Sequence, residues 1–186
     1  MTTVSNGRNR VRIIGGKWRS RIVKFPAAAQ LRPTPDRVRE TVFNWLGQRL
    51  DGRSCLDLFA GSGALGFEAM SRGAQRVVMV ECDRATAKGL KESALALEAS
   101  GLDVVEEDAL GYLKRPREKF DVVFLDPPYA SELAMRALAL LPQHLNPGAR
   151  VYVEAAEGMA PPAPWNVLRE DRAGAVRYAL LELISP

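Results

Sequence analysis

From residue 54 onward the chain alternates apolar segments with amphipathic ones, and this alternation limits the folds that it can adopt. Strands are predicted at five apolar runs, 54–59, 76–81, 103–107, 120–125 and 149–155. The segments between them predict helices over 63–72, 84–100, 109–114 and 131–141. Strands that are apolar along almost their whole length indicate a parallel sheet covered on both faces. The sequence therefore predicts a doubly wound α/β fold.

Two further strands are predicted after the Pro-rich loop 157–165, at 166–170 and 175–184. The second alternates apolar and polar residues and is predicted to run antiparallel to its neighbours. With these the sheet is Rossmann-like, mostly parallel and seven-stranded. Local signals add Asp83 and Ser131 as helix N-caps, and Gly73 and Gly101 as the residues that follow helix ends.

Positive charge is concentrated at the start of the chain. Residues 1–40 contain ten Lys and Arg against two acidic residues, which gives +8, whereas the whole chain carries +4 and the remainder therefore −4. A basic arm on an acidic body predicts a polyanionic partner, most often nucleic acid, although a solvated tail has the same composition. We favour nucleic acid because Ile13-Ile14-Gly15-Gly16 and Trp18 indicate an ordered segment, with short strands expected over 11–25.

A helix is predicted to follow this arm. Thr34 is the expected N-cap, Pro35 the first helical residue and Asp36 an acid in the first turn. Arg37 and Arg39 fall off the apolar stripe of this helix, so they are expected to face solvent or a ligand. We predict a basic N-terminal arm over 1–33, with its β/helix extension, and one α/β domain over 34–186.

Composition excludes several classes of function. No apolar run reaches the roughly 20 residues of a membrane helix, and the polar, basic start does not resemble a secretory signal. We therefore expect a cytoplasmic protein, monomeric by default, with no membrane partner. His144 is the only histidine, which argues against a metal site or a His-based nucleophile. Cys55 and Cys82 lie in apolar runs and are expected to be reduced core residues.

A glycine-rich loop follows the first strand of the domain. Gly61, Gly63 and Gly66 satisfy G-x-G-x-x-G, and Glu81 ends the next strand, where an acid can hold ribose hydroxyls. A nicotinamide or flavin enzyme has the same pattern. Asp57, four residues before Gly61, would repel a pyrophosphate but attract an ammonium or sulfonium group. It therefore favours S-adenosyl-L-methionine over a dinucleotide.

Acids end four successive strands: Asp57, Glu81, Asp108 and Asp126. Asp108 can accept a hydrogen bond from an adenine amino group, and together the four form a rim suited to a cationic cofactor. Each of them alone is more often a solvated strand end or a helix cap. Asp126 begins the motif Asp126-Pro127-Pro128-Tyr129, which directly follows the run 120–125. This is where open α/β sheets bind ligands.

The motif has the side chains needed to hold a flat amine. Asp126 and the Pro127 carbonyl can accept its hydrogen bonds, the diproline stiffens the loop, and Tyr129 can stack on a base. Asp126 as a helix cap and Tyr129 as an aromatic lid are the alternatives. A base reaches such a pocket only when it is unstacked, which is easiest in an RNA loop.

These motifs resemble those of known methyltransferases. Asp57 to Gly63 resembles motif I of class I S-adenosylmethionine-dependent enzymes, and the Asp126–Tyr129 motif resembles that of enzymes methylating amino groups of nucleobases. The run from Arg32 to Glu40, with Arg12 to Gly16 and Ser71 to Ala74, is similar to the bacterial 16S ribosomal RNA guanine-N2 methyltransferases. Ser93 departs from this pattern, since an asparagine is expected there.

The resemblance implies roles for three sets of residues. The catalytic set is Asp126, Pro127 and Tyr129. The set that binds S-adenosyl-L-methionine is Asp57, Phe59, Ala60, Gly61, Ser62, Gly63, Glu81, Cys82, Asp108, Ala109 and Asp126. The set that binds RNA is Arg12, Lys17, Arg19, Arg21, Arg32, Thr34, Arg37 and Arg39. The implied partner is 16S rRNA in an assembled or nearly assembled small ribosomal subunit.

Other functions share part of these signals. An adenine-N6 or other nucleobase amino methyltransferase on RNA or DNA would carry the same four-residue motif. A DNA enzyme usually needs a target-recognition domain, for which the chain has little room. A nicotinamide-dependent oxidoreductase lacks a plausible proton donor here. A non-catalytic RNA-binding module would not need the acidic rim.

Overall fold

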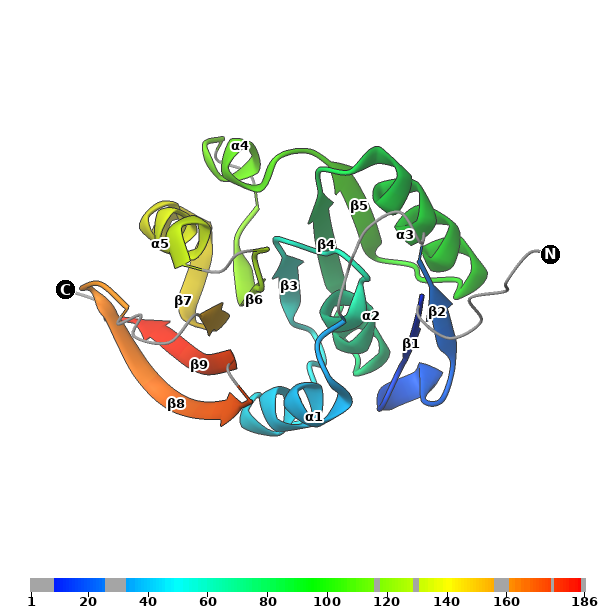
Figure 1. Ribbon diagram of the computed structural model, residues 1–186, viewed down its shortest axis with the longest axis horizontal. Coiled ribbons are helices and arrows are strands. Elements are labelled where there is room, and N and C mark those ends of the chain that lie inside the picture. The colour runs from blue at the N-terminus through cyan, green and yellow to red at the C-terminus, as the bar shows by residue number, and fades with distance from the viewer. Residues whose placement is uncertain are drawn as a thin grey trace.

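A seven-stranded sheet forms the centre of the protein (Figure 1). The computed structural model describes residues 9–25, 33–115, 118–128, 131–155, 161–174 and 176–184. The sheet contains β3 (Ser54–Asp57), β4 (Arg76–Glu81), β5 (Leu102–Glu106), β6 (Phe120–Leu125), β7 (Leu145–Ala155), β8 (Trp165–Ala173) and β9 (Val176–Leu183). The helices are α1 (Asp36–Trp45), α2 (Ala64–Ser71), α3 (Arg84–Ala96), α4 (Ala109–Leu113) and α5 (Ser131–Leu140), with a 3-10 turn η2 (Leu141–His144).

The order of the strands is β5-β4-β3-β6-β7-β9-β8. The first five pair in parallel, whereas β9 runs antiparallel to both β7 and β8. This confirms the predicted doubly wound, mostly parallel seven-stranded sheet and its antiparallel last strand. The chain reverses direction of winding between β3 and β6, which places a ligand crevice at the carboxyl ends of these two strands.

Each face of the sheet has its own apolar core, because successive side chains of a strand point to opposite faces. On one face Cys55, Val77 and Met79 pack with residues of α1, α2 and α3. On the other face Leu56 and Val78 pack with α4 and α5. Figure 1 shows α4 and α5 on the opposite side of the sheet from α1 and α2. No helix among the described residues is long and apolar enough to cross a membrane.

Several predicted boundaries need correction. The helix predicted over 84–100 ends at Ala96, because Glu98 has a positive φ of 52° that a helix cannot contain. Gly101 therefore lies in the turn before β5 and does not follow the helix end directly. Ser131 is the first residue of α5 and not its N-cap. Asp83 is confirmed as a cap, since its side chain accepts the Thr86 N–H at 2.7 Å.

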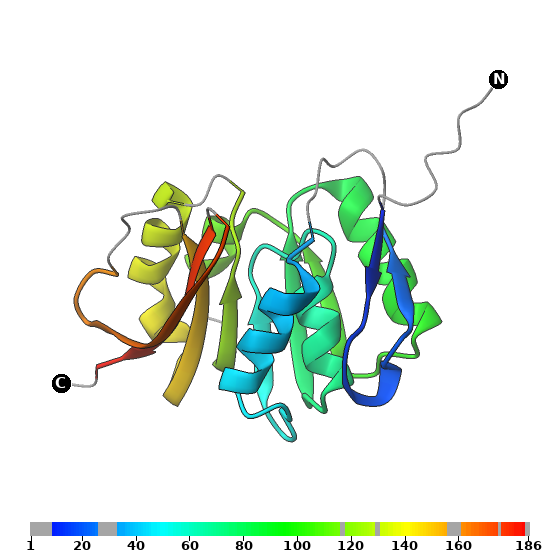
Figure 2. The ribbon, with the colours of Figure 1, turned by 60° about the horizontal axis from the view of Figure 1, so that its bottom comes forward.

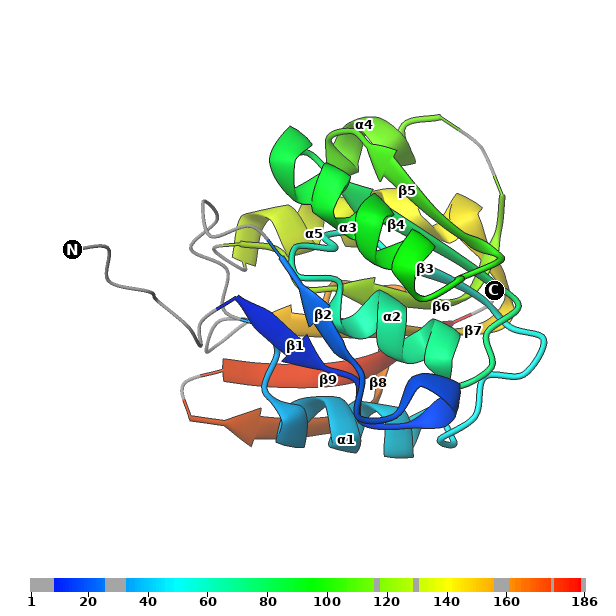
Figure 3. The same ribbon diagram turned by 90° about the vertical axis from the view of Figure 1, so that its right-hand side faces the viewer.

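The described part of the basic arm lies against the domain (Figures 2 and 3). Its strands β1 (Arg10–Arg12) and β2 (Ile22–Lys24) form an antiparallel hairpin beside α2 and α3, linked by a 3-10 turn, η1 (Gly16–Trp18). Ile13, Trp18 and Val23 are buried in the same core as α1 and α2. Residues 11–25 of the arm are therefore packed into this structure, as their apolar and turn residues predicted.

A buried carboxylate on α2 connects this arm to the domain. Glu68 is 0% exposed, and each of its oxygens accepts two hydrogen bonds. The backbone N–H groups of Ile14 and Gly15 both donate at 2.8 Å. Arg39 of α1 donates at 3.3 Å and Arg72, four residues along the helix, at 2.7 Å. One charge thus holds the arm, α1 and α2 together.

The prediction that Arg39 faces solvent or a ligand is wrong. Its side chain is 1% exposed and paired with Glu68 and Asp36, so its charge is used inside the protein. The N-cap assignment of Thr34 is also wrong, because α1 begins at Asp36 with Pro35 as its N-cap. Arg39 donates to the Thr34 backbone carbonyl at 3.2 Å instead, which fixes this segment.

We expect Glu68→Ala to destabilise the fold strongly. Removing one partner of a buried ion pair leaves charges unpaired and costs about 3–5 kcal/mol. The free energy of unfolding from urea titration measures this loss, and trypsin should cut between residues 10 and 25 faster than in the wild type. The matched control is Glu92→Ala, since Glu92 is exposed on α3 and forms a long ion pair at 3.8 Å with Lys88, which is also exposed. It should cost less than about 1 kcal/mol. Equal losses for the two variants would contradict the role of Glu68.

Candidate active site

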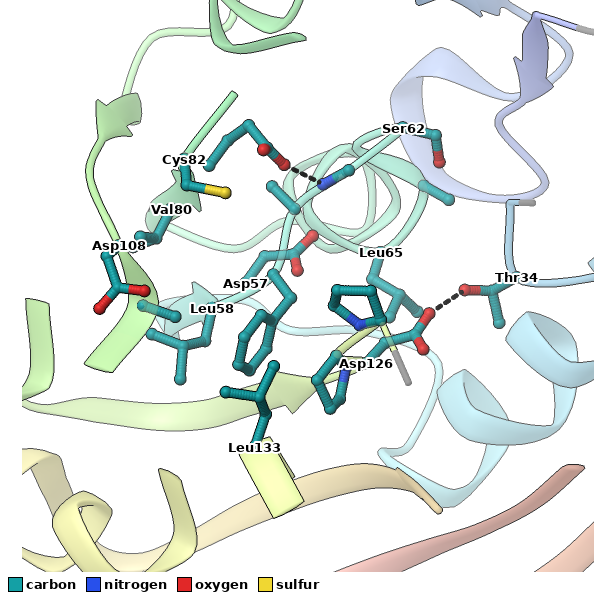
Figure 4. A pocket seen from close by; sticks show the side chains of 18 of the residues that line it. Thr34, Asp57, Leu58, Ser62, Leu65, Val80, Cys82, Asp108, Asp126 and Leu133 are labelled. Atoms are coloured by element: carbon teal, nitrogen blue, oxygen red, sulfur yellow. Dashed lines mark hydrogen bonds between the residues drawn. The ribbon is translucent and has the colours of Figure 1, made fainter. Parts of the chain in front are cut away.

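A cavity of about 460 Å³ opens at the carboxyl ends of the central strands (Figure 4). It is lined by Pro33, Thr34, Asp57, Leu58, Phe59, Ala60, Gly61, Ser62, Ala64, Leu65, Val80, Glu81, Cys82, Glu107, Asp108, Ala109, Asp126, Pro127, Pro128 and Leu133. All of the predicted cofactor-binding residues except Gly63 therefore meet at one cavity. Its size and its mainly apolar lining with a few acids fit a small-molecule ligand.

The glycine loop bends tightly between β3 and α2. Gly61 and Gly63 have φ angles of 49° and 76°, the left-handed region that side chains disfavour. A Cβ on Gly63 would lie 2.7 Å from both Leu90 and Phe67. Gly63 is thus required by packing under the loop, not by direct contact with the cavity. Since Gly61 has no side chain, the backbone of the loop can approach a ligand in the cavity closely.

Asp57, at the end of β3, holds the glycine loop through a hydrogen bond to the start of α2. Its side chain is almost fully buried and accepts the Gly66 N–H at 2.9 Å. Burial raises the pKa of Asp57 to about 7, and the nearby charges of Asp126 and Glu81 act in the same direction. A buried carboxylate with two acidic neighbours is stabilised by a cation, so this end of the cavity favours a positively charged ligand.

Two further acids of the rim are held by backbone groups. Glu81 accepts the N–H of Gly61 at 2.9 Å and that of Asp83 at 2.8 Å. Asp108 caps α4 by accepting the Gly111 N–H at 2.8 Å. Both line the cavity, so a structural role and a binding role coexist in each. Carboxylate oxygens retain further lone pairs for hydroxyl or amino donors.

Cys82 is not the core residue that its apolar surroundings predicted. It is exposed and lies at the rim of the cavity, whereas Cys55 is buried in the sheet. Burial raises the pKa of the Cys55 thiol to about 12, which leaves it unreactive. Among the described residues, no group of three or more His, Cys, Asp or Glu side chains is arranged to hold a metal ion.

Asp126 lies at the far end of the cavity from Asp108 (Figure 4). The Thr34 hydroxyl donates to its Oδ2 at 3.1 Å, so the segment before α1 contributes directly to the site. Burial raises the pKa of Asp126, and hydrogen bonds from Glu154 and Thr34 oppose that rise. Pro127 and Pro128 follow it in the lining, while Tyr129 lies outside the described residues.

Glu154 and Tyr152 are the residues that sequence reasoning missed. Glu154 lies near the end of β7, beside β6, so it continues the series of acids at strand ends. The Tyr152 hydroxyl donates to Glu154 Oε1 at 2.6 Å. The strand predicted at 149–155 contained both residues. Glu154 lies near the end of that strand, so it could have been added to the four acids predicted at the ends of the other strands.

The predicted RNA-binding residues divide into three groups. Lys17, Arg19, Arg21 and Arg37 are exposed, as is Arg12, which pairs with Asp36 at 3.0 Å. Thr34 and Arg39 are buried, so neither presents a free polar surface to RNA. Arg32 lies outside the described residues. The exposed cations of the arm and Arg37 remain candidates for phosphate contacts.

Comparisons with known proteins identify the family of this chain. The sequence profile of a family described as "Conserved hypothetical protein 95" matches residues 11–182. The Ribosomal RNA small subunit methyltransferase D of Haemophilus influenzae is 43% identical over 95% of this chain and 96% of its own. That of Escherichia coli K12 is 42% identical over 95% and 92%. A solved structure of a putative methyltransferase from Escherichia coli is similar with a TM-score of 0.86, 40% identity, and coverage of 94% and 98%.

We expect Gly63→Ala to destabilise the protein more than Gly52→Ala. Both glycines have a left-handed φ, 76° and 72°, but only Gly63 has neighbours within 4 Å of a Cβ. Left-handed strain costs about 1–2 kcal/mol in either variant. Crowding against Leu90 and Phe67 should cost Gly63→Ala a further 1–3 kcal/mol, roughly the price of overpacking a core. Urea denaturation measures both, and equal losses would show that packing under the loop is loose.

Proposed function

The chain belongs to the family described as Conserved hypothetical protein 95, and its relatives include small subunit rRNA methyltransferases. We propose that it is a 16S ribosomal RNA guanine-N2 methyltransferase. It transfers a methyl group from S-adenosyl-L-methionine to the exocyclic N2 amine of one guanine in the small ribosomal subunit. The observation that carries the proposal is the half-buried Asp126 carboxylate, which faces the cavity whose other acids favour a cation. The relatives named small subunit methyltransferase D support the rRNA substrate.

The residues present fit S-adenosyl-L-methionine. Asp57, with its raised pKa, suits the ammonium and sulfonium charges at the loop end. Glu81 suits ribose hydroxyls and Asp108 an adenine amino group, and both line the cavity together with the apolar Leu58 and Val80. When bound, this cofactor would supply a methyl group attached to a positively charged sulfur. The electron pair of the C–S bond stays on the sulfur, which is the leaving group.

The protein's own task is to orient a weak nucleophile. The lone pair of a guanine amine is delocalised into the ring, so the nitrogen must be held with that lone pair aimed at the methyl carbon. Asp126 and the Pro127 carbonyl accept hydrogen bonds from the amine and favour the positive charge that develops on nitrogen. Alignment of two bound reactants supplies up to about 7–11 kcal/mol in the best cases.

The exposed cations of the arm give the site its substrate class. Lys17, Arg19 and Arg21 lie in the connection between β1 and β2, and the hairpin is hydrogen-bonded to Glu68 of the domain. Such cations hold phosphates and set the register of RNA, while the cavity selects the base. We propose an assembled or nearly assembled small subunit as the natural substrate, a monomeric enzyme and a cytoplasmic location. Tyr129 is proposed to stack on the flipped guanine.

The function is tested by mapping modified bases in 16S rRNA from cells that lack this protein. We expect one N2-methylguanosine to be missing, and to return with the wild-type gene. Asp126→Ala should not restore it, with turnover at least about a hundredfold lower, since charge stabilisation at the reacting atom is lost. The control is Asp103→Ala, an exposed aspartate of β5, which should restore methylation. A missing N6-methyladenine would instead establish the adenine alternative.

Binding of S-adenosyl-L-methionine should release a proton from Asp57. The pKa of Asp57 is about 7 in the free protein, and a bound cation lowers it. Affinity should therefore rise between pH 6 and pH 8, by up to about tenfold per pH unit below the pKa. Calorimetry in buffers of different ionisation enthalpy counts the protons. Asp57→Asn cannot titrate, so it corrects for the cofactor's own ionisation. A wild-type pH dependence equal to that of Asp57→Asn would contradict the assignment.

A further inference from the structure

Glu154 lies against Asp126 and is hydrogen-bonded to it. The two acids end neighbouring parallel strands, since Leu125 of β6 pairs with Val153 of β7. Ionised carboxylates have only acceptor oxygens and repel each other at contact distance. A hydrogen bond between them therefore requires that the pair share one proton.

Burial raises the pKa of both acids, and the neighbours of each favour Glu154 as the one that holds the proton. Burial and the negative charge of Asp126 raise the pKa of Glu154 to about 8. The hydrogen bonds that Asp126 receives from Glu154 and Thr34 favour its ionised form. Tyr152 donates to Glu154 at 2.6 Å; this bond fixes the side chain and opposes part of the rise in the pKa of Glu154. Near neutral pH the arrangement is a carboxylic acid donating to a carboxylate.

We infer that Glu154 is a positioning residue: its carboxylic acid donates a hydrogen bond that keeps Asp126 ionised and oriented toward the target amine. This inference rests on the proposed function, because it needs an amine in front of Asp126. Glu154 is outside the lining of the cavity, so it acts through Asp126. Thr34 and Glu154 hold Asp126 from two different segments of the chain, which restricts its rotation.

Positive charge develops on the amine nitrogen during the proposed reaction. The amine nitrogen forms its bond to the methyl carbon while the C–S electron pair stays on sulfur, and the nitrogen becomes positively charged before it releases a proton to water. An ionised Asp126 stabilises that charge. When Glu154 also ionises, repulsion replaces its hydrogen bond and Asp126 loses its orientation.

Three other titratable groups lie near the pair. Tyr152 lies on the same strand, and Tyr178 of β9 lies opposite Glu154 in the sheet. Asp57 of β3 interacts with Asp126. Tyr152 has a raised pKa because it is buried beside these acids, so it stays protonated and remains a donor. Loss of the pair's shared proton is thus the event expected to limit activity as the pH rises toward 9.

The test is the pH profile of turnover with tritium-labelled S-adenosyl-L-methionine and small subunits from cells lacking the enzyme. Wild-type turnover should fall on the alkaline side with an apparent pKa near 8. Glu154→Gln keeps a donor toward Asp126 that cannot ionise, so its profile should lose this fall. Glu154→Ala should lower kcat about tenfold to a hundredfold, as expected for misplaced reacting groups. Its affinity for S-adenosylhomocysteine should stay unchanged.

Glu182→Gln is the matched control, because Glu182 lies on β9 and pairs with Arg150 at 3.0 Å. It should keep the wild-type profile. Three results would overturn the inference: a Glu154→Gln profile identical to wild type, Glu154→Ala turnover within twofold of wild type, or a folded Glu154→Gln enzyme inactive at every pH. The last would mean that Glu154 must give up its proton. If wild type methylates no exocyclic amine, the proposed function fails instead.

A readout that needs neither cofactor nor RNA follows from the same arrangement. Infrared difference titration of the free protein, with Asp57→Asn in every variant to remove the other titrating buried acid, should show a carboxylic acid band that disappears as the pH rises through about 8. The band should be absent in Glu154→Gln and present in Glu182→Gln. If it persists unchanged in Glu154→Gln, the proton does not reside on this pair and the inference is overturned.

Discussion

Glu68 is a carboxylate with no exposure to water, and four donors from three separate segments converge on it. An isolated charge in this position would be very unfavourable, so its partners must remain in place. Arg39, one of those partners, also holds the Thr34 carbonyl, and the Thr34 hydroxyl bonds Asp126. A continuous series of polar contacts therefore connects the basic arm with the reactive end of the cavity.

This series gives the arm two tasks. Its apolar residues complete the core over α2, and its exposed cations remain available for a polyanion. The hydrogen bonds from Ile14 and Gly15 to Glu68 hold the backbone of the hairpin against the domain that contains the cavity. In the proposed function, a phosphate bound on the arm would help to set which nucleotide reaches Asp126. Removal of the whole arm would expose the core, so point substitutions of its exposed cations separate binding from folding.

The electrostatic potential of the cavity depends on acids that influence one another's protonation. Asp57, Asp126 and Glu154 all have raised pKa values because they are buried near one another. In the proposed reaction the cofactor and the methylated amine would each bring positive charge to a different part of this cluster. The same burial that makes the acids costly in the free protein makes them effective partners for these charges.

Periodicity and motif spacing by themselves determined the strands, their mostly parallel arrangement and most of the cavity lining, since these depend on local pattern and on strands ending at one edge. A predicted helix boundary was wrong where the backbone leaves the helical conformation, as it does at Glu98. The burial of Arg39, the Thr34 contact and the Glu154 pair were decided only by tertiary structure. Each depends on which segment packs opposite a polar group, and a sequence pattern records the polarity of a residue but not its partner.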